Sequence, residues 1–264
     1  MFSYFSMLNP IFQALIAGIF TFFVTCLGSS FVFFFQKTKK IFLNIMLAIS
    51  GGIMIAASFF SLLEPGILIA NELHFNTWMI ILFGFLMGGL FLILCDYLVN
   101  YISKKNSNSS ISSIRRSILL FFSITLHNIP EGLVIGVSFG AVSLNSTSLI
   151  SAITLALGIA LQNFPEGSAI SLPMRQEGIS RWKAFLFGSL SAIVEPIFAV
   201  VGAILVLKVQ VLLPFVMAFA ASAMIFVVVK ELIPESQSNK NSSLMAGFFL
   251  IGFSIMMVLE LILQ

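Results

Sequence analysis

The stretch HNIPEG at residues 127–132 lies inside a long apolar segment, and a related stretch, QNFPEG, follows at residues 162–167. Each places a polar residue and a glutamate four positions apart, which is one turn of a helix and therefore one face. The proline before each glutamate has no N–H group, so a carbonyl one turn earlier loses its hydrogen-bond partner. Two such motifs on consecutive apolar segments predict two facing helices whose polar side chains converge between them.

The composition is that of a membrane protein. Of the 264 residues, 59% are apolar and 9% are charged, and the mean hydropathy is +1.11. A soluble domain is about half apolar and about a quarter charged. Because a spanning helix needs about 20 mostly apolar residues, this length accommodates roughly eight spans. We therefore expect an all-α membrane protein in which residues 1–264 form a single transmembrane domain that does not bind nucleic acid.

Hydropathy and basic residues together predict the topology. Twelve of the 13 Lys and Arg residues lie near loops after odd-numbered spans, and Lys208 is the exception. By the positive-inside rule these loops are cytoplasmic, so both termini lie outside. We expect residues 100–116 to be a flexible cytoplasmic linker, and the first ten residues, which lack Lys and Arg, argue against a cleaved signal peptide. The predicted spans are approximately residues 11–35, 43–63, 78–99, 117–140, 149–172, 184–207, 210–231 and 244–263.

A weak internal similarity relates the second and seventh spans. Residues 52–57 resemble residues 223–228, and both segments approach a proline, Pro65 or Pro234. The two spans run in opposite directions, which indicates an inverted repeat of spans 1–3 and 6–8 around spans 4 and 5, a 3+2+3 arrangement. Transporters often bind their substrate at such a repeat interface. Chance similarity between two apolar helices is the alternative.

Three acidic residues lie deep within predicted spans: Glu131, Glu166 and Glu195. Each buried charge costs about 2.5–3.5 kcal/mol on insertion scales, or roughly 10 kcal/mol for three. His127 is the only basic group at comparable depth and cannot balance them. Either the carboxylates are protonated or a cation lies among them; a divalent cation would neutralise two of the charges, and protons would compete with it. Paired glutamates therefore point to a cation site.

The ligand types restrict the ion. An imidazole with carboxylates suits Zn²⁺, Fe²⁺, Mn²⁺ and Cd²⁺. Amide oxygens of Asn128, Gln162 and Asn163 are weaker, neutral ligands, and a mixed site can release its ion as a transporter must. Interhelical hydrogen bonding by the polar residues is the alternative. Met54 lies mid-span, where methionine usually packs, and Cys26 and Cys95 are expected to pack as well.

At these motifs the sequence resembles the ZIP family of zinc- and iron-regulated metal transporters, in particular its bacterial GufA-like branch. The resemblance implies a binuclear centre with shared ligands between spans 4 and 5. His127, Glu131, Gln162 and Glu166 match one metal site, to which Met54 matches a contributing methionine. The second site is matched by Asn128, Asn163, Glu166 and Glu195, with Glu166 and Glu195 bridging. The resemblance also implies a homodimer and an elevator-like movement.

The sequence departs from many family members at a few positions. Gln162 replaces a histidine, Asn163 stands where some relatives have aspartate, and Lys230 stands where some have a potential ligand. A histidine-rich cytoplasmic loop is missing. Residues that match an exit route are Glu231, Glu235 and Asp96.

Some charged residues have an alternative interpretation. For Asp96 we expect an ion pair with Lys104 or Lys105 instead of an exit role. Glu72 and His74, in the predicted outer loop 65–77, are expected to be solvated, with metal gathering as the alternative.

We therefore predict a permease, and not an enzyme, that moves Zn²⁺, or Cd²⁺, Fe²⁺ or Mn²⁺, into the cytoplasm by alternating access. The ion is substrate and no cofactor is implied. The sequence has no G-x-x-x-x-G-K-[ST] motif, so movement must follow a gradient. The short loops favour a bacterial inner membrane. The alternatives are a proton-coupled permease for an organic substrate and an intramembrane metalloenzyme, although the H-E-x-x-H motif is absent.

Overall fold

The computed structural model describes residues 2–34, 40–74, 76–105, 112–144, 147–209, 212–237 and 242–263. These residues are almost entirely helical, and none of them is in a β-strand. The elements in chain order, with η for π-helical segments, are α1 (Phe2–Ser6), α2 (Pro10–Ser29), α3 (Phe31–Phe34), α4 (Lys40–Ala57), η1 (Ser58–Leu63), α5 (Glu64–Glu72), α6 (Thr77–Lys105), α7 (Ser112–Ser143), α8 (Leu149–Gln176), α9 (Arg181–Leu190), α10 (Val194–Lys208), α11 (Leu213–Val227), η3 (Val228–Leu232), α12 (Ile233–Ser236) and α13 (Ser242–Leu263).

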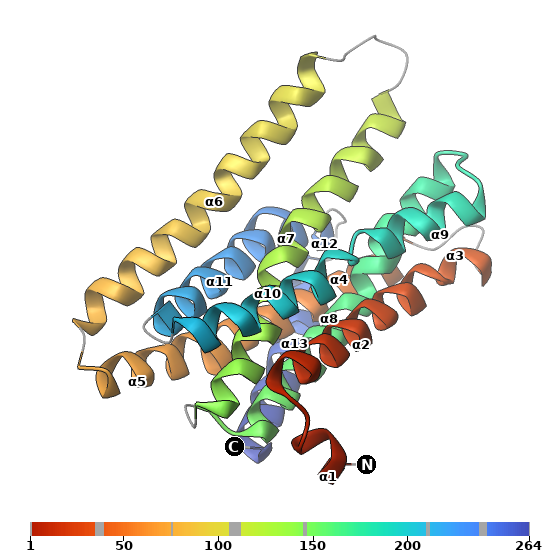
Figure 1. The fold of residues 1–264 in the computed structure, drawn as a ribbon. Helices are drawn as coiled ribbons and strands as arrows, with labels where there is room; N and C mark the ends of the chain where they lie inside the picture. Colours follow the sequence, from red (N-terminus) through yellow and green to blue (C-terminus); the bar gives the residue numbers. More distant parts are fainter. Residues whose placement is uncertain are drawn as a thin grey trace.

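The all-helical membrane fold is confirmed. Among the described residues, seven helical segments are long and apolar enough to cross a membrane. The remaining predicted span, 117–140, falls within α7, which has 32 residues and carries the first hexapeptide. Figure 1 shows both chain ends at the same end of the molecule. The count of eight spans and the side of the membrane on which the termini lie remain predictions.

Several helices extend beyond the apolar stretches that predicted them. Helix α6 continues to Lys105 and α7 begins at Ser112, so most of the predicted linker 100–116 is helical and residues 106–111 lie outside the described part. The predicted outer loop 65–77 is wrong for most of its length, because α5 runs to Glu72. Hydropathy reports the part of a helix that suits lipid, whereas backbone hydrogen bonding continues past it into polar sequence.

The helices pack as two groups. We call α2, α7, α8, α9 and α10 the site bundle, because α2 packs against α8 and α10, and α10 packs against α7. We call α4, η1, α5, α6, α11, η3, α12 and α13 the flanking bundle, in which α4 packs against α13 and α6 against α11. The bundles meet where α4 contacts α8 and where α11 contacts α7. Figure 1 shows α6 along the edge of the molecule.

Glycines allow the backbones of neighbouring helices to touch inside each bundle. A Cβ atom on Gly136 would lie 2.0 Å from the carbonyl oxygen of Ala199, and one on Gly52 would lie 2.0 Å from that of Phe249. Among the described glycines, every such approach to a backbone oxygen joins helices of the same bundle. Small residues give close helix packing where lipid supplies no hydrophobic driving force. Helices within each bundle are therefore in direct backbone contact.

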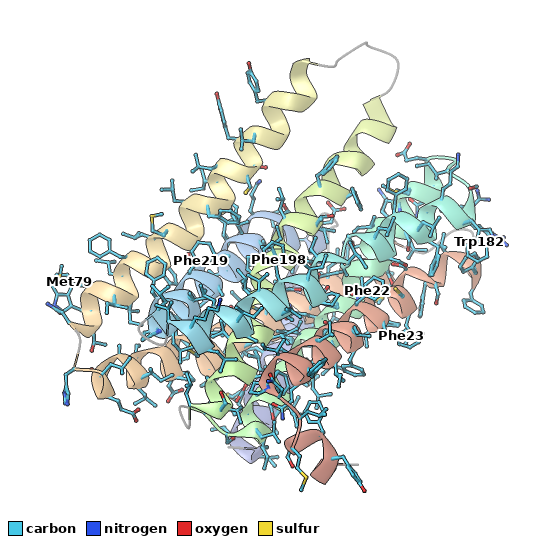
Figure 2. All side chains as sticks on the ribbon, viewed as in Figure 1. Phe22, Phe23, Met79, Trp182, Phe198 and Phe219 are labelled. Atoms are coloured by element: carbon cyan, nitrogen blue, oxygen red, sulfur yellow. The ribbon has the colours of Figure 1, made fainter. Side chains whose placement is uncertain are left out.

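Apolar side chains cover the outside, and polar side chains lie within. Figure 2 shows Phe23, Met79 and Trp182 projecting from the periphery, and they are 58%, 38% and 67% exposed. Glu131 and Glu195, by contrast, are fully buried. This distribution suits a protein surrounded by lipid, in which polar residues face the interior of the bundle.

Substitution at Gly136 tests the close packing inside a bundle. We expect Gly136→Ala to lower stability by about 1–3 kcal/mol, because its Cβ overlaps a backbone oxygen that cannot move independently. Gly247→Ala is the matched control, since nothing lies within 4 Å of its Cβ position. The measurement is the thermal unfolding midpoint in detergent. Equal midpoints for the two variants would contradict the packing described here.

Candidate metal centre

The two hexapeptides lie on α7 and α8, which pack against each other. Pro130 and Pro165 lie inside these helices, which continue on both sides of them. The final glycine of each hexapeptide is a point of close approach. A Cβ on Gly132 would lie 2.5 Å from the carbonyl oxygen of Glu195 on α10, and one on Gly167 would lie 2.2 Å from that of Thr25 on α2. The two glycines therefore allow α10 to pack beside Glu131 and α2 to pack beside Glu166.

Glu195 owes its position to a break in the predicted span 184–207. Pro196 cannot donate to the carbonyl of Ala192, which accepts instead from the backbone N–H of Glu195 at 3.0 Å. This shorter turn separates α9 from α10 and leaves the carbonyl of Ser191 without its usual helical donor. The side-chain amide of Asn128 donates to that carbonyl at 3.1 Å. The break thus places Glu195 in the first turn of α10, next to α7.

Amide side chains connect the helices across the centre. Gln162 donates from Nε2 to Oε1 of Glu131, which ties α8 to α7. Asn163 donates from Nδ2 to Oε2 of Glu195 at 2.8 Å, which ties α8 to α10. All four side chains are fully buried. The two neighbouring amides of α8 therefore each hold one carboxylate.

The other atom of each amide is a buried acceptor. The side-chain oxygens of Asn128, Gln162 and Asn163 have no hydrogen-bond partner among the described residues, and the same holds for Oε1 of Glu195. Leaving such atoms unpaired costs about 1–3 kcal/mol each, so native proteins do so rarely. Oxygens without donors are suitable ligands for a cation.

The centre gathers three buried carboxyl groups. Glu166 is 1% exposed, and Glu166 and Glu131 both lie close enough to Glu195 to interact with it electrostatically. No lysine or arginine is buried among the side chains that the structure describes. The charge of the three carboxylates is therefore not balanced by a buried basic residue in this part of the chain.

Two further predicted ligands have different outcomes. The backbone of His127 lies in α7, four residues before Glu131, but its side chain lies outside the described part of the structure. Met54 is fully buried in α4 of the flanking bundle. One turn earlier on α4, Ser50 donates from its hydroxyl to the backbone carbonyl of Gln162 at 3.3 Å. This contact brings α4 to the second hexapeptide.

The described His, Cys, Asp and Glu side chains include no group of three arranged to hold an ion by themselves. The side-chain amides of Gln162 and Asn163 on α8 donate to two of the carboxylates, those of Glu131 and Glu195. A complete ligand set among these residues must therefore include amide oxygens or His127.

The residues of the predicted exit route lie away from the centre. Asp96 forms an ion pair with Lys230, whose ammonium also lies 5.6 Å from the ring centroid of Phe226. The pairing expected from the sequence is with Lys104 or Lys105, and the side chains of these two residues lie outside the described part; the pair that the structure shows is with Lys230, which η3 brings against α6. Of the other two predicted residues, Glu231 is half-buried in η3 and Glu235 is exposed in α12.

Sequence reasoning missed several polar residues. Thr21 contacts Glu195, and Glu260 near the end of α13 is 1% exposed. An acidic residue inside an apolar segment was the available signal for Glu260. The outer pair Glu72 and His74 is exposed, as expected, and His74 has a positive φ of 55°.

Comparison with known proteins agrees with the geometry. The family model described as ZIP zinc transporter matches residues 104–260, more than half of the chain. The protein named zinc transporter ZIP11 of Xenopus tropicalis is 34% identical over 96% of this chain and 97% of its own length, and the human protein of that name is 32% identical over the same shares. Zinc transporter GufA of Myxococcus xanthus is 36% identical over 63% of this chain and 66% of its own length.

Full-length similarity to named zinc transporters, the family model and the helical membrane fold all agree. The chain belongs to the ZIP family of zinc transporters, which are integral, multi-pass membrane proteins that move metal ions.

Proposed function

We propose that this chain carries Zn²⁺, or Cd²⁺, Fe²⁺ or Mn²⁺, into the cytoplasm through the centre formed by α7, α8 and α10. The observation that carries the proposal is the buried set of carboxylates that lies beside amide oxygens without donors. The zinc transporters to which the chain is similar support Zn²⁺ as the first ion to test.

The charge balance requires a mobile cation. Three carboxylates in an apolar medium cost roughly 10 kcal/mol on insertion scales. A divalent ion reduces the net charge of Glu131, Glu166 and Glu195 from three negative charges to one, which a proton or a second ion neutralises. Because metal ligands must be deprotonated, lower pH weakens the binding of the ion. Transport coupled to, or inhibited by, protons follows from this competition.

The hydrogen bonds support two sites with shared ligands. Glu131 and Gln162 bond each other, and in the family resemblance both belong to one site, with His127 and Glu166. Asn163 and Glu195 bond each other, and both belong to the second site, with Asn128 and Glu166. When an ion enters, each side-chain amide rotates so that its oxygen, and no longer its N–H group, points toward the ion and the carboxylate.

The packing supports alternating access. Close backbone contacts stay inside the site bundle and the flanking bundle, so each can move as a body. Ser50 contacts the second hexapeptide from the flanking bundle, and the family resemblance assigns Met54 of the same helix to the first site, so movement between the bundles would change the surroundings of the ion. Rocking or sliding of one helix group past another is a common transporter mechanism.

The setting of the transporter is also a proposal. The basic residues near loops after odd-numbered spans support a cytoplasmic location for those loops and outer termini. The resemblance to bacterial relatives supports a homodimer in a bacterial inner membrane.

Zinc flux into proteoliposomes tests the function. We expect saturable uptake by the parent protein and at least about a tenfold loss in Glu166→Ala, because this carboxylate is shared by both proposed sites. Glu64→Ala is the matched control, since Glu64 is exposed in α5, and it should keep the parent rate. Absence of flux of all four ions from correctly folded protein would reject metal transport, and organic substrates would then be tested.

Selectivity should follow the residue at position 162. Gln162→His replaces an amide oxygen with an imidazole nitrogen, which binds Zn²⁺ more strongly relative to Mn²⁺. We therefore expect a lower KM for Zn²⁺, slower maximal uptake because release slows, and a higher Zn²⁺ to Mn²⁺ ratio in competition. Gln176→His, at the exposed end of α8, is the control. An unchanged ratio would remove Gln162 from the set of ligands.

A further inference from the structure

Two membrane helices are interrupted at corresponding places by π-helical segments. In one, α4 leads into η1 and then α5, which begins with Glu64 and Pro65. In the other, α11 leads into η3 and then α12, which begins with Ile233 and Pro234. π-helical turns are rare and occur frequently at functional sites. Neither segment belongs to the metal centre.

The correspondence extends to single residues. A buried methionine precedes each proline, Met54 by eleven positions and Met224 by ten, and η1 is likewise one residue longer than η3. The residue four positions before the proline is Ser61 in η1 and Lys230 in η3. In an α-helix the backbone carbonyls of Ser61 and Lys230 would accept from the N–H group four residues later, but a proline stands there and has no N–H group. The helical hydrogen bonding is therefore interrupted at the same point in both segments.

The neighbouring helices correspond as well. A Cβ on Gly88 of α6 would lie 2.0 Å from the carbonyl oxygen of Phe219 on α11. A Cβ on Gly252 of α13 would lie 2.1 Å from that of Ile49 on α4. Helices α6 and α13 therefore dock on the two interrupted helices through equivalent glycines. This agreement supports the inverted repeat that the sequence predicted.

An acidic residue lies eight positions after each of these glycines, and it contacts the π-helical segment. Asp96 on α6 forms an ion pair with Lys230. Glu260 on α13 accepts a hydrogen bond from the hydroxyl of Ser61. We call Ser61 with Glu260 the η1 clasp, and Asp96 with Lys230 the η3 clasp. The η1 clasp is buried, whereas the side chains of the η3 clasp are about a third exposed.

The clasps lie toward opposite ends of the flanking bundle. Helix α13 begins at Ser242, shortly after η3 and α12, and Glu260 is 18 residues further along it. At 1.5 Å per residue this is a distance of about 27 Å, close to the thickness of a bilayer core. The η1 clasp is therefore on the side of the C-terminus and the η3 clasp on the other side.

We propose that the two clasps are opposed closing contacts of the transport cycle, an inference that rests on the alternating access proposed above. When the extra residue of a π-helical turn passes along a helix, the stretch that it crosses rotates by about 100° relative to the rest of the helix. Each clasp fixes that register by holding the π-helical segment against α13 or α6. Release of the η1 clasp opens the centre toward the C-terminal side, and release of the η3 clasp opens it toward the other side.

Thiol accessibility from the two sides measures this directly. The background carries Cys26→Ala and Cys95→Ala, and Ser50→Cys at the edge of the centre supplies the only reactive thiol. A membrane-impermeant methanethiosulfonate reagent is added to one side of oriented vesicles, and the ratio of the two labelling rates is recorded. This readout needs no metal flux, so absence of zinc transport would reject the proposed function without deciding the result here.

Variants of the η1 clasp and of the η3 clasp should shift the ratio of the two labelling rates in opposite directions. We expect Ser61→Ala and Glu260→Met to raise the ratio in favour of the C-terminal side by about fivefold, as loss of one hydrogen bond permits. Asp96→Asn and Lys230→Met should shift the ratio by a similar factor the other way. The exchange of Asp96 and Lys230 for each other in a double variant should return the ratio to the parent value.

Matched controls are Glu64→Gln and Lys208→Met, both at exposed positions, which should leave the ratio unchanged. A shift in the same direction for both clasps, or no shift in folded variants, would overturn the proposal. Ser61→Ala removes a single hydroxyl group, so it tests the η1 clasp even if a charge-changing variant fails to fold.

Discussion

The burial of three carboxylates among lipid-facing helices is the constraint on which this structure depends. Glu131, Glu166 and Glu195 are charged groups in a medium that cannot solvate them. Amides of α8 donate to Glu131 and Glu195, and a break in the sixth predicted span places Glu195 in the first turn of α10, which packs against α7. Hydrogen bonds from amides orient two of the carboxylates without neutralising them, and this is the basis of the cation site proposed above.

The burial of these carboxylates also explains how the helices pack. Backbones touch inside each bundle, whereas the two bundles contact each other through side chains. Glycines such as Gly132 and Gly167 bring α10 against α7 and α2 against α8 beside the carboxyl groups. In the proposed cycle the centre must also be reached from both sides in turn. The hydrogen bond of Ser50 to the carbonyl of Gln162 joins the two bundles beside the second hexapeptide. In the proposed mechanism, rigidity around the ion and mobility beside it are divided between the two helix groups.

Much of this could be predicted from the sequence, because membrane helices depend on local hydropathy and the hexapeptide spacing places ligands on one helix face. The pairing of Gln162 with Glu131 could not, since it depends on how α7 and α8 are rotated toward each other. Nor could the π-helical segments, which arise where a proline meets tertiary packing, or the partner of Asp96. Sequence proximity suggests Lys104 or Lys105 as its partner, whereas the fold brings Lys230 to it from a distant helix.

Anomalous diffraction from crystals soaked in Cd²⁺ would test most directly whether the polar centre binds the transported ion. Cadmium scatters strongly and accepts the same carboxylate, imidazole and amide ligands. The predicted result is two peaks between α7, α8 and α10, with Glu166 and Glu195 shared by both ions. Peaks confined to exposed residues such as His74, with the bonds of Gln162 and Asn163 to the carboxylates unchanged, would contradict the centre described here.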